Sequence, residues 1–479
     1  MIRLKTDKNI PKVGNILLLA EAACDFAPYG LTAQDIDYIR QQTEKKAEQI
    51  AIRKGCYWLL VQTVDASQPE NREKEKIRCG AAAIHTIIQQ QHIQSITIIN
   101  TTGNNAFTLA FAEGLALTAY QFLKYVGKKK AERQFSLQEV TLTDVSPEQT
   151  NELVHLLTAV YKTRDLVNEP PNVLTSVRLA EEIRDMAQDA DLKVQILDKA
   201  AIENLQMGGI LAVNKGSVEA PSFTILEWRP AEAHNKKPVV LVGKGLVYDT
   251  GGHSLKPTAN SMDYMKCDMS GGAAVAATLY AVAKAKLPVY VVGLVPSTDN
   301  RLSASAYSPG DIITMYDGTT VEALNTDAEG RLILADALAY ANKYEPELVI
   351  DIATLTGAAH RAIGEGAMVG MGNAPQETMN RLKASGDAVY ERIAEFPFWD
   401  DYAKSLKSDI ADLKNVGGDL AGAITAGKFL EHFTTYPYIH LDIAGPAFLQ
   451  AADEYRSKGG TGTGVRLLFD FLKTYHKSL

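Results

Sequence analysis

The sequence predicts two α/β domains, of which the larger, C-terminal one has a mostly parallel central sheet flanked by helices. Three observations predict this fold class. The 479 residues suffice for at least two domains, strand-like and helix-like stretches alternate along the chain, and the C-terminal strands are continuous apolar runs, which are typical of a sheet buried on both faces. We expect an N-terminal domain at residues 1–150, a linker helix at 151–171 and the larger domain at 172–479.

The sequence of the N-terminal part of the chain predicts a small α/β domain. Residues 58–62 and 95–100 are apolar and β-branched, as in strands, and residues 81–91 between them have helical periodicity. The histidines and acidic residues of this part show no spacing typical of a metal or catalytic cluster. We therefore expect a scaffold or assembly role for it.

The linker helix is predicted by the periodicity of residues 147–167, and it must end at the two prolines of Asn168-Glu169-Pro170-Pro171-Asn172. Strands and helices then alternate again. In parallel sheets, ligands bind beyond the carboxyl ends of the strands. The residues that follow the strands are therefore the candidates for a binding site. The expected elements are strands at 238–242, 289–295 and 348–351 and helices at 273–286 and 329–342.

Composition excludes several classes of protein. With 46% hydrophobic and 22% charged residues and no apolar run of roughly 18 residues, we expect no membrane span. The polar start, without a secretory leader, favours the cytoplasm. The formal charge of −8 argues against nucleic acid as a partner. The basic run at residues 124–133 could touch phosphates, but we favour a solvated helix end.

Common catalytic motifs are absent from the sequence. Residues 422–428 match the GxxxxGK spacing of a phosphate-binding loop, but Phe429 stands where that loop needs a Ser or Thr hydroxyl. There is no GxSxG serine-hydrolase motif and no HExxH zinc motif.

A dense set of charges in apolar surroundings remains. Lys244 directly follows an apolar strand, and Asp249 and Lys256 follow within the next twelve residues. Asp268 stands at the start of an alanine-rich helix, where it could serve only as an N-cap.

A second group of charges lies before the next alanine-rich helix. Asp327, Glu329 and Arg331 alternate there, as if all three pointed in one direction. Helix capping accounts for one carboxylate of this segment at most.

Four carboxylates at one edge of a sheet would repel each other, by about 4 kcal/mol for a pair roughly 4 Å apart at an effective dielectric constant near 20. Two divalent cations would balance them. Carboxylates favour magnesium or manganese, whereas the Irving–Williams order favours zinc. Lys244 is either a metal ligand, if deprotonated, or the partner of a carboxylate; its position leaves both open.

Together these segments resemble the leucine aminopeptidase family, the dinuclear-metal cytosol aminopeptidases, whose signature NTDAEGRL stands complete at residues 325–332. The resemblance implies a metalloaminopeptidase, with residues 172–479 as its catalytic domain. It would hydrolyse the N-terminal residue, preferably an apolar one such as leucine, from peptides through a water or hydroxide that bridges two metals. Similar motifs lie at residues 168–172, 242–252, 265–268, 351–357, 408–412 and 440–445.

The same resemblance implies roles for single residues. Lys256 would stabilise the oxyanion of the tetrahedral intermediate. Arg331 would hold a bicarbonate ion that acts as general base, with backbone groups near Gly330 and Leu355 also in contact. Zinc or manganese would be held at one site by Lys244, Asp249, Asp268 and Glu329, and at the other by Asp249, Asp327 and Glu329.

The resemblance finally implies a substrate and a partner. Met265, Thr354, Gly357 and Ala444 would form an apolar side-chain pocket, and the free α-amine of the peptide would ligate a metal. Family members are cytoplasmic homohexamers, so we expect a homohexamer here. The alternatives are a DNA-binding regulatory hexamer, a dipeptidase of narrow specificity for substrates such as cysteinylglycine, and a two-metal phosphoesterase, against which the order of the motifs argues.

Overall fold

A computed structural model of the chain describes residues 1–11, 13–21, 24–26, 29 and 31–475. The chain forms two compact units. The first consists of Met1–Tyr161 and Ala451–Lys458, and the second of Lys162–Gln450 and Gly459–Leu479. Helix α5 (Pro147–Asn168) continues from the first unit into the second, so the division between the units falls within a helix.

The first unit contains a sheet with the strand order β1-β6-β5-β2-β4-β3, which is parallel except for the β3–β4 hairpin. Both predicted strands are present, as parts of β4 and β5. Its elements are β1 (Arg3–Thr6), β2 (Ile16–Ala20), α1 (Ala33–Glu44), β3 (Gln49–Lys54), β4 (Tyr57–Thr63), α2 (Glu70–Gln90), β5 (Ser95–Asn100), α3 (Asn105–Thr118), α4 (Lys130–Arg133) and β6 (Glu139–Leu142).

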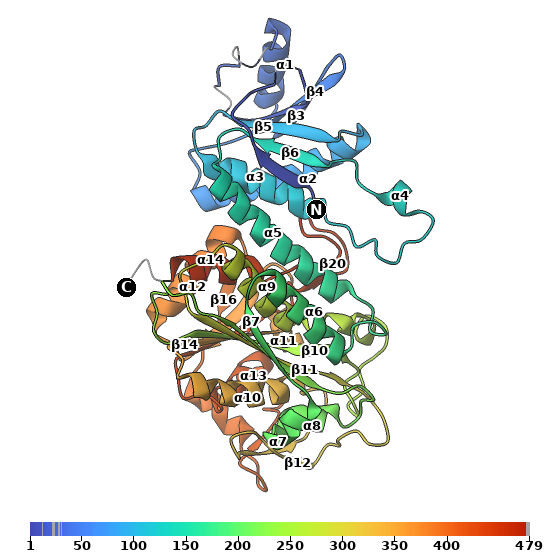
Figure 1. Cartoon of the computed structure of the whole chain (residues 1–479), viewed down its shortest axis with the longest axis vertical. Coiled ribbons are helices and arrows are strands. Elements are labelled where there is room, and N and C mark those ends of the chain that lie inside the picture. Colours follow the sequence, from blue (N-terminus) through green and yellow to red (C-terminus); the bar gives the residue numbers. More distant parts are fainter. Residues whose placement is uncertain (12, 22–23, 27–28, 30, 476–479) are drawn as a thin grey trace. The chain divides into compact units, whose positions relative to one another are not determined.

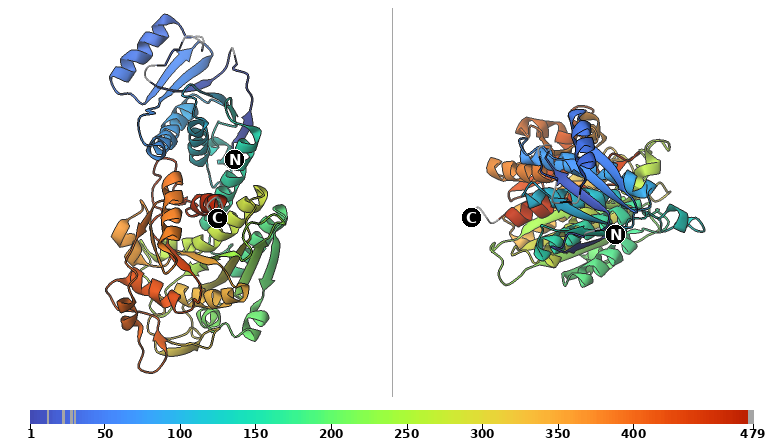
Figure 2. Two further views of the ribbon diagram at one scale, coloured as in Figure 1. Left: turned by 90° about the vertical axis from the view of Figure 1, so that its left-hand side faces the viewer. Right: turned by 90° about the horizontal axis from the view of Figure 1, so that it is seen from above.

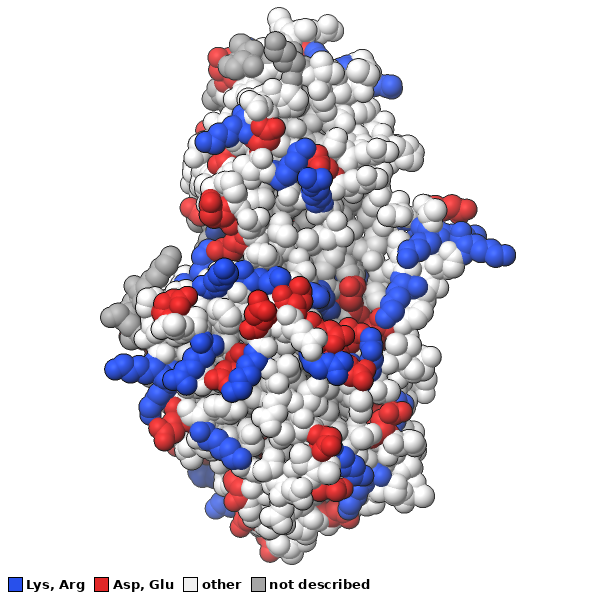
Figure 3. All heavy atoms as spheres, in the orientation of Figure 1, with Lys and Arg blue, Asp and Glu red and all other residues white. Residues whose placement is uncertain are grey.

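Helix α2 begins about ten residues before the expected helix because its first turns are charged and therefore lack the apolar periodicity on which the expectation rested. The basic run at residues 124–133 contributes the four-residue helix α4, and residues 127–134 are exposed. Basic side chains gather on this segment, whereas both signs are mixed over the rest of the drawn face (Figure 3). This exposure agrees with a solvated segment.

The second unit contains the larger sheet, with the order β16-β15-β18-β14-β9-β11-β8-β7 and with β10 paired to β11. Strands β18, β14, β9, β11 and β10 run parallel, and the antiparallel pairings lie toward the edges, which confirms the predicted fold class. The strands are β7 (Lys193–Leu197), β8 (Ser222–Trp228), β9 (Val239–Gly243), β10 (Gly245–Asp249), β11 (Val291–Asn300), β14 (Leu348–Ala353), β15 (Met368–Gly372), β16 (Ile393–Glu395) and β18 (Tyr438–Asp442).

Helices cover both faces of this sheet (Figures 1 and 2). Helices α6, α9 and α14 pack together on one face, and α8, α10 and α13 pack on the other. The two alanine-rich helices, α9 and α10, are buried at every residue except Lys284 at the end of α9, so the sheet lies between apolar layers. The helices are α6 (Ser176–Asp189), α7 (Lys199–Asn204), α8 (Gly208–Asn214), α9 (Ser270–Lys284), α10 (Gly330–Ala341), α11 (Gly357–Ile363), α12 (Gln376–Val389), α13 (Gly422–Glu431) and α14 (Val465–Thr474).

Smaller elements complete the second unit. The segment that matches GxxxxGK lies within α13 and is helical, so it forms no phosphate loop. Among the described residues, no helix is both long and apolar enough to cross a membrane. The short strands are β12 (Asp311–Thr314), β13 (Thr320–Ala323), β17 (Leu413–Lys414), β19 (Phe448–Leu449) and β20 (Gly459–Gly460), and the 3-10 helices are η2 (Met262–Cys267), η3 (Asn342–Tyr344) and η4 (Asp400–Leu406).

The parallel strands bring the carboxyl ends of β9, β10, β11, β14 and β18 to one edge of the sheet. Strand β11 extends to Asn300, beyond the predicted end at residue 295, because its polar end pairs with β10. Helix α9 begins close to this edge: a β-carbon on Gly271 would lie 2.0 Å from the carbonyl oxygen of Ile352 in β14. Only glycine permits this approach, which brings the residues before α9 to the strand ends.

Candidate metal centre

Lys244 is the residue between β9 and β10, and its side chain is buried. Its ammonium nitrogen lies 2.8 Å from Oδ2 of Asp268 and 3.0 Å from Oε1 of Glu329, and it donates to the carbonyl oxygen of Thr354 at 3.0 Å. Burial lowers the pKa of Lys244, but the surrounding carboxylates outweigh burial, so the pKa lies above its ordinary value. In this arrangement Lys244 is an ion-pair partner.

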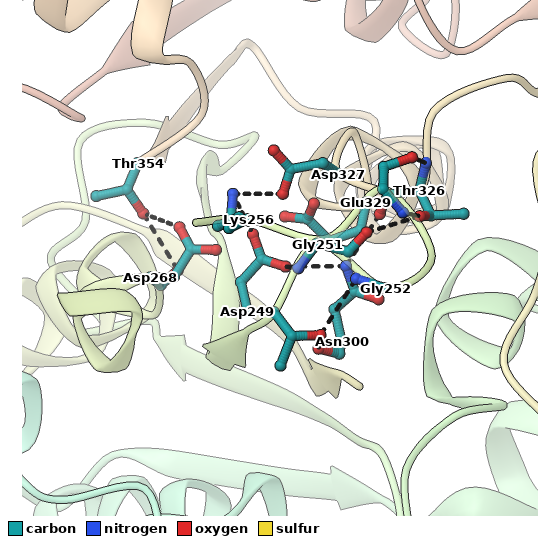
Figure 4. Close-up of polar contacts among 12 residues, drawn as sticks. Asp249, Gly251, Gly252, Lys256, Asp268, Asn300, Thr326, Asp327, Glu329 and Thr354 are labelled. Atoms are coloured by element: carbon teal, nitrogen blue, oxygen red, sulfur yellow. Dashed lines mark hydrogen bonds and ion pairs between the residues drawn. The ribbon is translucent and has the colours of Figure 1, made fainter. Parts of the chain in front are cut away.

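Asp249 ends β10, and its two oxygens have different surroundings (Figure 4). Oδ1 accepts hydrogen bonds from the backbone N–H of Gly251 and from Nδ2 of Asn300, each at 2.8 Å. Oδ2 lies 2.8 Å from the ammonium nitrogen of Lys256, which also contacts Oδ1 of Asp327. The two aspartates, which come from different segments, therefore converge on one lysine.

Asp268 does not act as a cap of α9. That helix has Met269 at its N-cap and no side-chain capping bond, whereas Oδ1 of Asp268 accepts a hydrogen bond from the hydroxyl of Thr354 at 2.7 Å. Burial raises the pKa of Asp268. The capping alternative is therefore wrong, and the carboxylate faces Lys244.

Glu329 immediately precedes α10 and makes no capping bond to it either. Oε1 contacts Lys244, but Oε2 is buried and has no hydrogen-bond partner among the described residues. The backbone over residues 327–331 is not an extended strand: it forms a turn at residues 326–327 and then enters α10. Asp327 and Glu329 nevertheless converge on the two lysines, because the turn brings both side chains to the strand ends.

The carboxylates form a cluster with a net negative charge. Oxygen atoms of Asp249, Asp268 and Glu329 lie within 4.8 Å of one another. With Asp327, four carboxylates face the two ammonium groups of Lys244 and Lys256, which leaves a formal charge of −2. Closely spaced, buried carboxylate oxygens, one of them unpartnered, are the donor set that a hard divalent cation requires. The residues therefore fit divalent metal ions.

Arg331 lies in the first turn of α10, where its guanidinium is buried. Nη1 donates to the carbonyl oxygen of Asn415 at 2.7 Å, and Nε has no partner among the described residues. Burial lowers the pKa of Arg331 to about 10, so the group remains cationic at neutral pH. Gly330 begins the same helix, and the backbone N–H of Leu355 donates to Oδ1 of Asp442 at 3.1 Å.

Of the four residues expected to line a pocket, Thr354 and Ala444 follow strands, Gly357 begins a helix and Met265 lies within η2. Thr354 follows β14 and binds Asp268, and the N–H of Ala444 donates to the same Asp442 oxygen that binds Leu355. Met265 lies in η2, and its carbonyl oxygen accepts from the N–H of Asp268. Gly357 begins α11 and is exposed.

The sequence reasoning missed several residues that connect these segments. Nδ2 of Asn300 and the hydroxyl of Tyr307 both donate to the carbonyl oxygen of Thr326, at 2.9 and 2.8 Å. The hydroxyl of Thr326 donates to the carbonyl oxygen of Gly251 at 2.6 Å, and Asn415 bonds the backbone of Asn325. The polar end of the apolar strand β11, residues 297–300, is a sequence signal that could have identified Asn300.

Known proteins resemble this chain over most of its length. Residues 161–469 match the family model described as the catalytic domain of the cytosol aminopeptidase family. A probable cytosol aminopeptidase of Syntrophotalea carbinolica is 42% identical over 413 residues, which cover 83% of this chain and 82% of that protein.

Two solved structures are similar to this one. The first is a bottromycin maturation enzyme in complex with Mn, with a TM-score of 0.84, 28% identity and coverage of 96% of this chain and 99% of that one. The second is a mutant of tomato leucine aminopeptidase, with a TM-score of 0.85, 26% identity and coverage of 99% and 96%.

Proposed function

The chain belongs to the cytosol aminopeptidase family and is a metal-dependent aminopeptidase, and we propose that the carboxylate cluster at the strand ends is its metal site. Two divalent cations, zinc or manganese, would be bound. One site would be formed by Lys244, Asp249, Asp268 and Glu329, and the other by Asp249, Asp327 and Glu329.

One observation carries this proposal. Oε2 of Glu329 is buried without a hydrogen-bond partner among the described residues, in a cluster where oxygens of Asp249, Asp268 and Glu329 lie within 4.8 Å. A buried, unpartnered carboxylate oxygen costs free energy unless a cation offsets it. A manganese complex of a structurally similar enzyme supports divalent metal here.

When bound, two such cations supply Lewis acidity, which lowers the pKa of a bound water and polarises a carbonyl group. Lys256 is the more exposed of the two lysines, with 15% of its side chain accessible against 3% for Lys244. Burial lowers the pKa of Lys256, but the negative charges of Asp249, Glu329 and Asp327 raise it by more than burial lowers it. The group is therefore an ammonium at neutral pH. Lys256 can therefore reach a substrate and donate to the oxyanion that forms on the scissile carbonyl.

Without metal, the ammonium group of the buried Lys244 pairs with Asp268 and Glu329. To serve as a ligand of the first site, Lys244 would lose its proton when the cation binds. Arg331 remains cationic and has an unpartnered Nε, so it can bind an anion beside the cluster. That anion would be bicarbonate, held by Arg331 with backbone groups near Gly330 and Leu355, and it would supply a general base for the attacking water.

The substrate is a peptide with a free N-terminus. An apolar first residue such as leucine would enter a pocket formed by Met265, Thr354, Gly357 and Ala444. Thr354 donates to Asp268, so one side of this pocket adjoins the metal site. A free amine is required because it would bind beside the carboxylates.

We also propose a homohexamer in the cytoplasm, as the family resemblance implies. Sedimentation-velocity analysis of the purified protein tests the assembly, and a monomer at micromolar concentration would contradict it. The comparisons do not favour the DNA-binding alternative.

The experiment that tests the function is an assay on leucine p-nitroanilide and its N-acetylated counterpart. The protein is first treated with a chelator and then supplied with manganese or zinc. We expect cleavage of the free-amine substrate only, lost on chelation and restored by metal. Equal cleavage of both substrates would contradict the role of the amine, and activity that survives complete metal removal would contradict the metal site.

A further inference from the structure

Asn300 ends β11 and pairs in register with Asp249, the last residue of β10. Only 1% of its surface is exposed. Its Nδ2 donates to Oδ1 of Asp249 at 2.8 Å and to the carbonyl oxygen of Thr326 at 2.9 Å. Because both partners are acceptors, the amide atom that faces them must be the donor Nδ2, and this fixes the orientation of the amide.

These two bonds join two of the three segments that supply the carboxylates. Asp249 lies on β10, and Thr326 precedes Asp327 in the turn before α10. A single amide therefore connects an aspartate to the backbone of the turn that carries another. Both aspartates contact Lys256. One ammonium group can contact both carboxylates only while the distance between the two aspartates is maintained.

The bond to Asp249 also distinguishes its two oxygens. Oδ1 accepts from Asn300 and from the N–H of Gly251, whereas Oδ2 faces Lys256. An oxygen that already accepts two hydrogen bonds is a poor ligand for a cation. A neutral amide achieves this without changing the charge of the cluster, which a lysine at the same position would do.

Stability alone does not account for Asn300. Its Oδ1 is buried and has no hydrogen-bond partner among the described residues, so this side chain carries a desolvation cost on one atom. Such a cost is tolerated where a polar group has another function.

We propose that Asn300 is a positioning residue of the metal site: it fixes Asp249 so that only Oδ2 is presented to cations, and it holds the turn of Asp327 at a set distance from Asp249. The inference rests on the proposed function, because it assumes that this cluster binds metal. Groups that orient metal ligands in this way commonly change metal affinity by about 10- to 100-fold when they are removed.

The test is calorimetric titration of the chelator-treated full-length protein with Mn²⁺ alone. Asn300→Ala removes both bonds, and Asn300→Leu removes them while keeping most of the volume. The matched control is Thr298→Val on the same strand. Thr298 is fully buried and accepts from Nδ2 of Asn214 at 3.0 Å, but within the described part of the chain its hydroxyl makes no hydrogen bond to the carboxylates of the cluster. We expect at least tenfold weaker binding of Mn²⁺ in both Asn300 variants and unchanged binding in the control.

A second readout separates positioning from a merely structural role. The kcat of the Asn300 variants should recover as the Mn²⁺ concentration is raised, and the unfolding temperature of the metal-free variants should match that of Thr298→Val. Unchanged Mn²⁺ affinity, or loss of folding in both Asn300 variants, would overturn the inference. If the unsubstituted protein itself bound no Mn²⁺, the proposed metal site would fail first, and this inference with it.

Discussion

Lys244 crosses the start of α10 directly over Gly330: a β-carbon on Gly330 would lie 2.6 Å from both Cε and Nζ of Lys244. Glycine is therefore required here for close approach and not for an unusual backbone angle. This approach lets the ammonium group of Lys244 reach Glu329, the residue immediately before Gly330, at 3.0 Å.

The first prediction concerns this contact. In Gly330→Ala the new methyl group should displace the ammonium of Lys244, because little room remains beside the buried Asp268 and Glu329. We expect roughly tenfold weaker metal binding and a parallel loss of activity, measured by Mn²⁺ titration and leucine p-nitroanilide hydrolysis. The control is Gly366→Ala, whose β-carbon would meet nothing within 4 Å. Equal effects of both substitutions would contradict the explanation.

The second prediction concerns Glu329. Glu329→Gln keeps the shape of the side chain but removes one negative charge from the cluster and one anionic ligand. We expect at least roughly 100-fold weaker metal loading, and turnover should fall below detection. Metal content after dialysis, measured by mass spectrometry, checks this. Glu377→Gln on the exposed side of α12 is the control, and a normally metallated, active Glu329→Gln enzyme would refute the site.

The third prediction separates Lys256 from the metal ligands. Lys256→Ala removes a cation from beside Asp249 and Asp327, so metal binding should be retained or strengthened. The kcat should fall by about 10²- to 10³-fold if the ammonium stabilises the oxyanion. Metal content and kcat are measured on the same preparation. If Lys256→Ala and Glu329→Gln lost metal equally, the division of roles would be wrong.

The fourth prediction concerns Arg331. The guanidinium is bonded on one side to the carbonyl of Asn415, while Nε is unpartnered among the described residues. Added bicarbonate should therefore raise the rate of the protein freed of carbonate, and Arg331→Ala should abolish this stimulation and lower kcat by roughly 10²-fold or more. Rates at a series of bicarbonate concentrations check both statements. Equal stimulation of the variant would exclude Arg331 as the anion site.

The sequence predicted the carboxylates and lysines of the site because each follows an apolar strand or precedes an alanine-rich helix, where a charge is conspicuous. Asn300 could have been identified from the polar end of β11, but Thr326 and Asn415 could not be identified in the same way. Amide and hydroxyl residues are common in loops, and their importance here comes from contacts with residues far away in the sequence. For example, the carbonyl oxygen of Asn415 accepts from Arg331, which lies 84 positions earlier in the chain.

Two differences between the local sequence patterns and the structure have a common physical origin. The alternating charges at residues 327–331 and the continuous apolar run at 289–295 are local patterns. The conformation of the first segment depends on the start of α10, and the length of β11 depends on its pairing with β10. Tertiary pairing of this kind leaves no local pattern.

The last prediction concerns the pH dependence of the first unit. His85 of α2 is buried, with its ring edge-on to Phe135 at 4.8 Å between centroids. Burial lowers its pKa to about 4, from an ordinary value of 6.5. Below pH 6.5 the unfolded chain takes up a proton that the folded unit does not, so stability falls as the pH falls toward 4. The full effect is about 3 kcal/mol.

His85→Leu should therefore flatten the pH dependence of the free energy of unfolding between pH 6.5 and 4, relative to the unsubstituted unit. Trp58 of β4 reports on this unit once Trp228 and Trp399 are replaced by phenylalanine, because the chain has three tryptophans. Urea unfolding followed by its fluorescence at several pH values gives the measurement. The control is His92→Asn, an exposed histidine with a positive φ that asparagine tolerates. Parallel pH profiles for His85→Leu and the unsubstituted protein would show that His85 is not the group whose protonation destabilises this unit in acid.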